Sequence, residues 1–225
     1  MAMIPDQDKE FLRDKFSEEL QNPVTIIAFI KKSSDLQQPG LECEFCDETE
    51  QLVDEVVELS DKIRIESHEF SQEDQLVKNL GIDKLPALVL TGDSAKGVRY
   101  FGIPGGFEFS SLVEDIIDVS KNATDLPQEV KEKVHSIDQD VHIQVFMTPT
   151  CPYCPSAVRI AHQMAIENPQ HIKADAIDAA EFPHLVNRYN INAVPTIVVN
   201  DKIQFEGALP EDEFVKRVVD ALGAV

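Results

Sequence analysis

The sequence carries one arrangement of motifs twice. A Cys-x-x-Cys motif occurs at residues 43–46 and again at residues 151–154, each time after an apolar, strand-like run. Pro86 follows the first cysteine of its motif by 43 residues, and Pro195 follows the first cysteine of its motif by 44. A fixed order of motifs at a constant spacing is typical of a duplicated structural unit.

Other pairs of residues keep the same register. Glu69 precedes Pro86 by 17 residues and Asp178 precedes Pro195 by 17, while Gly102 and Gly207 lie 105 residues apart. A chain of 225 residues suits two domains of about 100 residues each. We therefore predict an N-terminal unit at residues 1–120 and a C-terminal unit at residues 121–225.

The hydrophobic periodicity predicts the same order of helices and strands in both units. Predicted strands cover residues 24–30, 63–70, 87–91, 98–101, 141–147, 172–178, 196–199 and 203–205. Predicted helices cover residues 6–20, 49–59, 107–120, 129–137 and 157–166, a short helix at 182–189 and a final helix after Pro210. One more short helix, ending at Gly81, is expected to be capped by Ser71 with Asp74 in a capping box.

Composition excludes several classes of protein. The net charge of −21 argues against binding to nucleic acid or to anionic membranes. No apolar run approaches the length of a membrane span, and the first residues lack the apolar core of a secretory signal, so we expect a cytoplasmic protein. All four cysteines lie in the two motifs, unlike the scatter of a secreted disulfide scaffold.

Chemistry is expected first at residues 151–154, between a strand and a helix. The start of a helix offers unpaired N–H groups and a positive dipole end, which favour a thiolate on the first cysteine. The second cysteine lies one turn on and can close a disulfide. Half of a zinc site and a pair of buried structural thiols are the alternatives, but neither explains the position at this junction.

The order of elements and the motif Cys-Pro-Tyr-Cys resemble a known family. Two units of thioredoxin-like order in tandem, each with Cys-x-x-Cys, resemble the glutaredoxin-like protein disulfide oxidoreductases of thermophilic archaea and bacteria. The resemblance covers the whole chain and implies an α/β fold of two tandem thioredoxin-like folds, each a mixed β-sheet flanked by helices. The segment before Cys43 departs from its counterpart by nine additional residues.

The resemblance also implies roles for two prolines. Pro86 and Pro195 should be cis and lie beside the active-site sulfurs. The backbone of Leu85 and Val194 would then be free to pair with a substrate peptide as an added strand. An ordinary trans proline at the start of an edge strand is the alternative.

Within this scheme the two cysteines of each motif have different roles. Cys151 and Cys43 are expected to attack, and Cys154 and Cys46 to resolve the mixed disulfide. Resolution releases a proton, and the strand period places Glu69 and Asp178 on otherwise apolar faces, where an acid has a raised pKa and accepts that proton. A strand-end acid facing solvent is the alternative for both positions.

We expect an enzyme that oxidises, reduces or isomerises protein disulfides, with the C-terminal site dominant. The alternative is an electron relay to a dedicated partner such as a peroxiredoxin, fed by a thioredoxin-reductase-like flavoenzyme. No flavin or nicotinamide fingerprint and no metal-ligand spacing of histidines is present, so we expect no bound cofactor or metal. A zinc-binding structural protein would need both cysteine pairs to share one ion.

Charge predicts that the two sites are unequal. Acids surround the first pair, among them Glu44, Asp47 and Glu48, whereas residues 148–163 contain no acid but include Arg159 and His162. Neighbouring carboxylates disfavour a thiolate, so Cys151 should ionise more readily than Cys43 and its disulfide should be the stronger oxidant.

Overall fold

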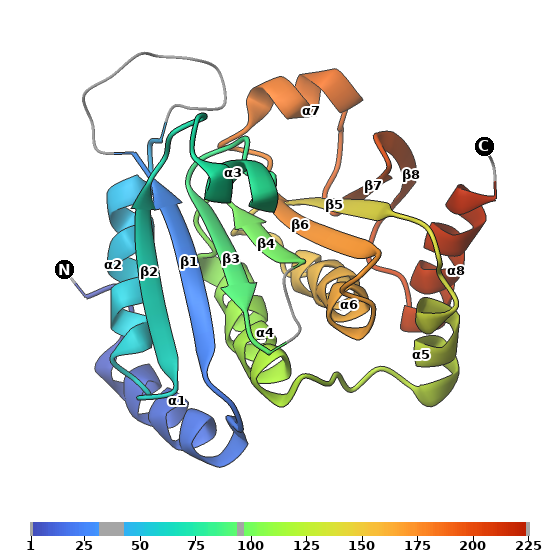
Figure 1. The fold of residues 1–225 in the computed structure, drawn as a ribbon. Helices are drawn as coiled ribbons and strands as arrows, with labels where there is room; N and C mark the ends of the chain where they lie inside the picture. The colour runs from blue at the N-terminus through green and yellow to red at the C-terminus, as the bar shows by residue number, and fades with distance from the viewer. Residues whose placement is uncertain (1, 32–42, 94–96, 224–225) are drawn as a thin grey trace.

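The described residues form an eight-stranded mixed sheet in the order β2-β1-β3-β4-β6-β5-β7-β8 (Figure 1). The structure, a computed structural model, describes residues 2–31, 43–93 and 97–223, so the long segment predicted before Cys43 lies largely outside the described residues. The strands are β1 (Val24–Ile30), β2 (Ile63–Glu69), β3 (Ala87–Thr91), β4 (Val98–Phe101), β5 (Val141–Met147), β6 (Ile172–Asp178), β7 (Thr196–Val199) and β8 (Lys202–Glu206).

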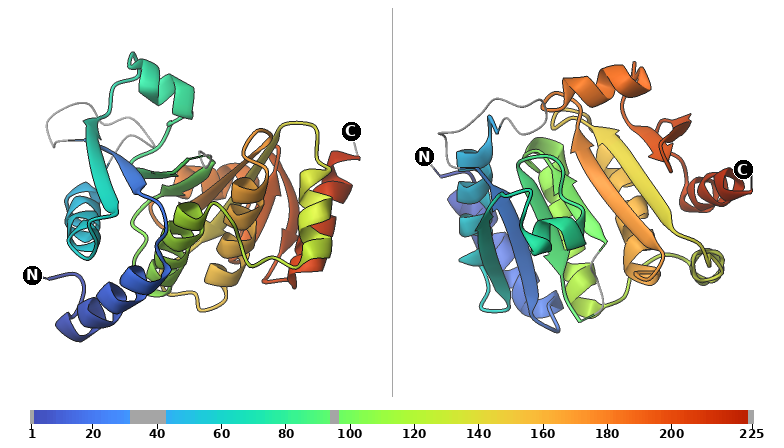
Figure 2. Two further views of the ribbon diagram at one scale, coloured as in Figure 1. Left: turned by 60° about the horizontal axis from the view of Figure 1, so that its bottom comes forward. Right: turned by 45° about the horizontal axis from the view of Figure 1, so that its top comes forward.

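Each half of the chain builds four neighbouring strands with the same pairing. In the first half β1 is parallel to β2 and antiparallel to β3, which pairs with β4; in the second half β5, β6, β7 and β8 repeat this order. The halves meet where β4 runs parallel to β6, with Phe101 opposite Ile177. One continuous sheet therefore crosses the predicted domain boundary (Figure 2).

Helices cover both faces of this sheet unequally. They are α1 (Asp6–Glu19), α2 (Cys46–Val57), α3 (Gln75–Leu80), α4 (Phe109–Lys121), α5 (Gln128–His135), α6 (Cys154–Glu167), α7 (Pro183–Tyr189) and α8 (Glu211–Leu222), with a 3-10 turn η1 (Gly106–Glu108) before α4. Side chains of α3 and α7 pack in the smaller hydrophobic cluster, and those of the other α-helices pack in the larger one. The two clusters use alternate residues of the strands, for example Ile26 and Ile27.

Local sequence signals explain most boundaries, with two corrections. α3 ends at Gly81 in the left-handed conformation, as predicted, but its N-cap is Asp74, whose carboxylate accepts a hydrogen bond from the Leu76 N–H at 2.8 Å. The cap predicted at Ser71 is therefore wrong. α2 begins at Cys46 rather than near residue 49, so both second cysteines start a helix.

A buried polar network joins the halves between α4 and α6. Asp115 on α4 accepts hydrogen bonds from the Tyr100 hydroxyl and from Arg159, and lies 2.5 Å from Nδ1 of His162. Arg159 also donates to Asp118 at 2.5 Å. Because Asp115 is fully buried, these cationic and hydroxyl partners compensate the loss of water around its charge, and the pKa of Asp115 is lowered despite burial.

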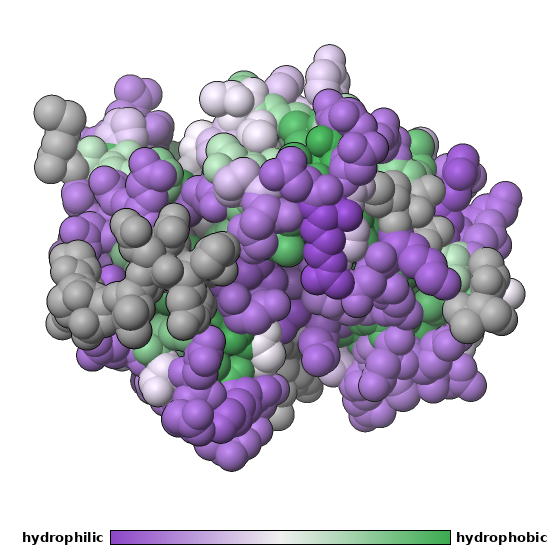
Figure 3. Space-filling view, turned by 90° about the horizontal axis from the view of Figure 1, so that it is seen from above, coloured by the Kyte–Doolittle hydropathy of each residue, from purple (hydrophilic) through white to green (hydrophobic). Residues whose placement is uncertain are grey.

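One face of the molecule is mostly polar. The face seen from above is dominated by hydrophilic residues, with smaller hydrophobic patches between them (Figure 3). None of the helices in the described part of the chain is long and apolar enough to cross a membrane.

Candidate active sites

The second Cys-x-x-Cys lies where β5 gives way to α6. The Cys151 N–H bonds to the Thr148 carbonyl at 3.0 Å, which turns the chain, and Cys154 is the first residue of the helix. Pro155 occupies the first helical turn, where its missing N–H removes no helical bond. This local sequence places Cys151 just before the helix N-terminus, as predicted.

The two sulfurs of this site differ in environment. Cys151 is half-buried, and its thiol points to the Val194 carbonyl oxygen at 3.8 Å. Cys154 is fully buried behind it. Burial raises the pKa of the Cys154 thiol, the hydrogen bond to Cys151 raises it further, and the Thr148 backbone opposes the rise. An accessible sulfur in front of a buried one is the arrangement needed for attack followed by resolution.

Both prolines that the resemblance singles out follow cis peptide bonds, Leu85–Pro86 and Val194–Pro195. That part of the expectation is confirmed. Val194 is half-buried and its carbonyl meets Cys151, whereas Leu85 is almost completely buried. The use of these backbones by a substrate remains a prediction.

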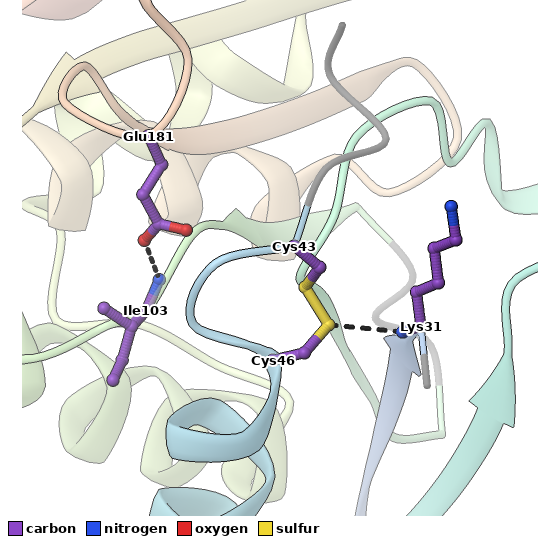
Figure 4. The surroundings of a disulfide bond; sticks show 5 residues. All are labelled: Lys31, Cys43, Cys46, Ile103 and Glu181. Atoms are coloured by element: carbon purple, nitrogen blue, oxygen red, sulfur yellow. Dashed lines mark hydrogen bonds between the residues drawn. A yellow bond between two sulfur atoms is a disulfide. The ribbon is translucent and has the colours of Figure 1, made fainter. Parts of the chain in front are cut away.

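The first Cys-x-x-Cys is oxidised. Cys43 and Cys46 form a disulfide with their Cα atoms 5.3 Å apart, and the sulfur of Cys46 accepts a hydrogen bond from the Lys31 N–H at 3.2 Å (Figure 4). Cys43 is half-buried and Cys46 is buried, so exposure follows the same order as at the second site. Sulfurs joined in a disulfide do not coordinate zinc, so a shared zinc site would need this pair to be reduced.

The two strand-end acids lie in different environments. Asp178 is buried, and burial raises the pKa of its carboxyl group. Hydrogen bonds from the backbone of Ala180 and Glu181 lower this pKa, but burial has the larger effect. Glu69 is exposed, so the prediction of a buried acid is wrong at this position. β2 is an edge strand, whereas β6 lies between β4 and β5 and is covered on both sides.

A buried acid that sequence reasoning missed lies at the second site. Glu108 comes from the first half, at the end of η1, and is fully buried. Burial raises its pKa to about 7, and its charge is one of the influences that raise the pKa of Cys154. Neither carboxyl oxygen accepts a hydrogen bond of ordinary geometry from the described residues, although Ser111 is near enough to oppose the pKa rise.

The position of Glu108 follows from the close approach of the two halves. Gly106 has φ +58°, and a Cβ there would lie 2.3 Å from the Pro149 carbonyl oxygen, which also accepts the Phe107 N–H at 2.9 Å. Only glycine permits this contact between the segment before α4 and the loop that carries Cys151. In the sequence, the Gly105-Gly106 pair is the signal that could have indicated this close approach.

Arg159 and His162 do not serve the second site as charge predicted. Both are engaged by Asp115, on the face of α6 that packs against α4. The predicted inequality of charge therefore rests on the acids around Cys43 rather than on cations near Cys151, and the second site has buried acids of its own, Glu108 and Asp178.

Known proteins show the same architecture. A protein disulfide oxidoreductase from Aeropyrum pernix K1 is 30% identical, with a TM-score of 0.85 over 96% of this chain and 93% of that one. The chain belongs to this tandem thioredoxin-fold family. A thioredoxin-domain model matches residues 141–220. The predicted family and fold class are thereby confirmed, and the chain is a thioredoxin-fold member of this family with two Cys-x-x-Cys motifs.

A second group of relatives carries the same pair of folds within longer proteins. One alkyl hydroperoxide reductase component of Escherichia coli is 29% identical over 203 residues, covering 90% of this chain and 35% of that protein. The N-terminal domain of the alkyl hydroperoxide reductase AhpF from Enterococcus faecalis has a TM-score of 0.85 at 25% identity, over 96% of this chain and 99% of that one. This member of the family thus spans about a third of the length of the E. coli reductase subunit.

Proposed function

We propose that this chain exchanges electrons with the thiols and disulfides of other proteins, mainly through Cys151 and Cys154. The observation that carries the proposal is the half-buried Cys151 at the start of a helix, in front of a fully buried Cys154. A thiolate on Cys151 attacks a substrate disulfide, and one substrate sulfur leaves as a thiolate. Cys154 then loses its proton and attacks Cys151, which releases the second substrate thiolate and transfers two electrons to the substrate.

The proton from Cys154 needs an acceptor inside the protein. Glu108 is fully buried and near enough to Cys154 for its charge to raise the pKa of that thiol, and its own pKa of about 7 suits proton exchange near neutral pH. Asp178 is the second candidate, since it is buried and raises the pKa of Glu108 through its charge. We assign Glu108 the larger role because its own charge acts on Cys154.

The segments at the cis prolines are proposed to hold the substrate. The Val194 carbonyl meets Cys151 at the second site, and Leu85 and Pro86 hold the equivalent place before β3 in the first half. An extended peptide would add to the backbone at these points while its disulfide faces the attacking sulfur. The contact between Cys151 and the Val194 carbonyl supports this placement at the second site.

Turnover with a protein disulfide tests this proposal. The full chain should reduce insulin with dithiothreitol as the electron donor and should reactivate a scrambled disulfide protein. Cys151→Ser and Cys154→Ser are the site variants, with Ser156→Ala on the same helix as a matched control. Turnover by the Cys151→Ser chain at the unmodified rate would contradict the proposal.

A relay of electrons to one dedicated partner is the second candidate. The similarity to a component of an alkyl hydroperoxide reductase over 90% of this chain favours it. In this role a thioredoxin-reductase-like flavoenzyme would reduce the chain and a peroxiredoxin would oxidise it, in the cytoplasm. A peroxide-coupled assay with these two proteins distinguishes the candidates, because a dedicated relay would support peroxide reduction and leave insulin almost untouched.

We also propose that the boundary between the two thioredoxin-like units lies between residues 120 and 121.

A further inference from the structure

The junction of β4 and β6 brings an acid from each half towards the site of the other half. The carboxyl ends of these parallel strands lie side by side, with Phe101 opposite Ile177. The segment that leaves β4 carries Glu108 to the second site. The segment that leaves β6 carries Glu181 towards the first site, where the disulfide lies (Figure 4).

Glu181 is held in place by the first half. One carboxylate oxygen accepts the Ile103 N–H at 2.7 Å, and the other is turned to the side of the disulfide (Figure 4). Gly102 has φ +92°, and a Cβ there would lie 2.8 Å from the bonded oxygen and 2.7 Å from Asp178 Cβ. Glycine at this position therefore leaves the room in which Glu181 lies.

The first site contains no buried acid from its own strand β2, because Glu69 is exposed. Burial raises the pKa of the half-buried Glu181 to about 7; the Ile103 N–H opposes this rise, and the charges of Asp178, Glu44 and Glu48 add to it. Among the described residues, these three acids are the charged groups with the largest effect on Glu181. The same exposed Glu44 and Glu48 disfavour a thiolate on Cys43, so attack by this sulfur benefits from a base.

The two sulfurs of the first site face different partners. Cys46 accepts a hydrogen bond from the Lys31 N–H, which stabilises a thiolate on that sulfur. Cys43 lies on the side of the disulfide nearer Glu181 (Figure 4). A proton acceptor at Glu181 would therefore serve Cys43 rather than Cys46.

We propose that Glu181, supplied by the second half, is the proton-exchange group for Cys43 at the first site. This inference rests on the proposed thiol–disulfide exchange. The Cys43 thiol gives its proton to the Glu181 carboxylate while its sulfur attacks a disulfide, and one sulfur of that disulfide leaves as a thiolate. Cys46 then loses its proton to solvent, attacks Cys43 as a thiolate and expels the second thiolate, so two electrons pass from the dithiol to the external disulfide. Reduction of the site follows the same steps in reverse, with protonated Glu181 returning the proton to Cys43.

The test isolates the first site in the full chain with Cys151→Ser and Cys154→Ser. The reduced chain is mixed with oxidised glutathione at pH 5.5 to 8.5, quenched with acid, alkylated and analysed by mass spectrometry for the glutathione adduct and the Cys43–Cys46 disulfide. Glu181→Gln should slow adduct formation about tenfold at pH 8 and remove the inflection near pH 7. Glutamine still accepts the Ile103 N–H, so the loop keeps its hydrogen bond.

The matched controls are Glu44→Gln and Glu48→Gln, which remove charges of the same sign from the same site. Loss of a repelling charge leaves the attack rate unchanged or raises it slightly, whereas loss of a base lowers it. A Glu181→Gln chain that reacts as fast as its parent, or faster, would overturn the proposal. The proposal would also be overturned if the rate of adduct formation by the parent chain showed no inflection near pH 7. This second outcome does not depend on the folding of the Glu181→Gln chain. Failure of the unmodified protein to reduce insulin would instead contradict the proposed function, since glutathione reports on the first site alone.

Discussion

The strand after the active-site helix is a free edge in the first half and an interior strand in the second. Among the described residues β2 pairs with β1 alone, whereas β6 is enclosed between β5 and β4. The acid at the end of each strand follows this difference, since Glu69 is exposed and Asp178 is buried. A duplicated sequence order thus gives two sites whose environments depend on how the copies are joined.

The most severe test of this inequality removes each attacking sulfur in turn. Cys151→Ser should lower insulin reduction at least about 100-fold, because the attacking thiolate is lost, while Cys43→Ser should lower it much less. Steady-state turnover measures both effects, and circular dichroism checks that each variant folds. Equal losses in the two variants would show that the sites work as equals.

The acids of the second site provide the next largest effect. Glu108→Gln should slow resolution of a mixed disulfide about tenfold or more, and Asp178→Asn should slow it less. Glu108 accepts a proton only when ionised and its pKa is about 7, so resolution should be fast above pH 7 and fall as the pH drops through that value.

Rapid-quench experiments follow formation and resolution of the mixed disulfide separately. Slower formation with unchanged resolution would contradict the assignment of Glu108, and an equal effect of both variants on both steps would contradict a proton-acceptor role for Asp178. Exposed Glu129→Gln is a suitable control.

Reduction potentials sharpen the comparison further. The disulfide of Cys151 and Cys154 should have the higher potential, by roughly 30 mV or more, because carboxylates near Cys43 disfavour the thiolate form of the first site. Chains with one pair changed to serine, equilibrated in glutathione buffers at low and high salt, give each value. A first-site potential equal to or above that of the second would refute the predicted direction of electron flow from Cys43 and Cys46 to Cys151 and Cys154.

The smallest expected effect compares the short helices α3 and α7. Asp74→Ala should lower the free energy of unfolding by about 1 kcal/mol, because it removes the bond to the Leu76 N–H. In the described structure α7 has no side-chain cap and begins with Pro183, so it has no equivalent hydrogen bond to lose. Urea unfolding measures the Asp74 variant, with exposed Asp93→Ala as its control.

Local sequence signals predicted the helices and strands, but they did not predict which residues of one half lie near the site of the other half. The strands at residues 24–30, 141–147, 172–178 and 196–199 agree with prediction because long apolar runs and alternation are encoded in neighbouring residues. The tight turn at Asn200 and Asp201, both with positive φ, is local in the same sense.

Three features of the sites could not be predicted from residues that are adjacent in the sequence. The strand period shows which face Glu69 shares, but whether that face is covered depends on the next strand in the sheet. Glu108 and Glu181 reach their sites through the β4–β6 pairing, which no local pattern encodes. The same is true of Arg159, which a linear reading places near Cys151 and the fold directs to Asp115.

Pairing of β4 with β6 also determines what would happen if the two copies were separated. Cutting the chain between them would turn two interior strands into unprotected edges, whose free N–H and C=O groups recruit other strands and promote aggregation. It would also deprive the second copy of Glu108 and the first of Glu181. If Glu108 and Glu181 act as proposed, a separated half would keep its cysteines and lose the acid that exchanges protons with them.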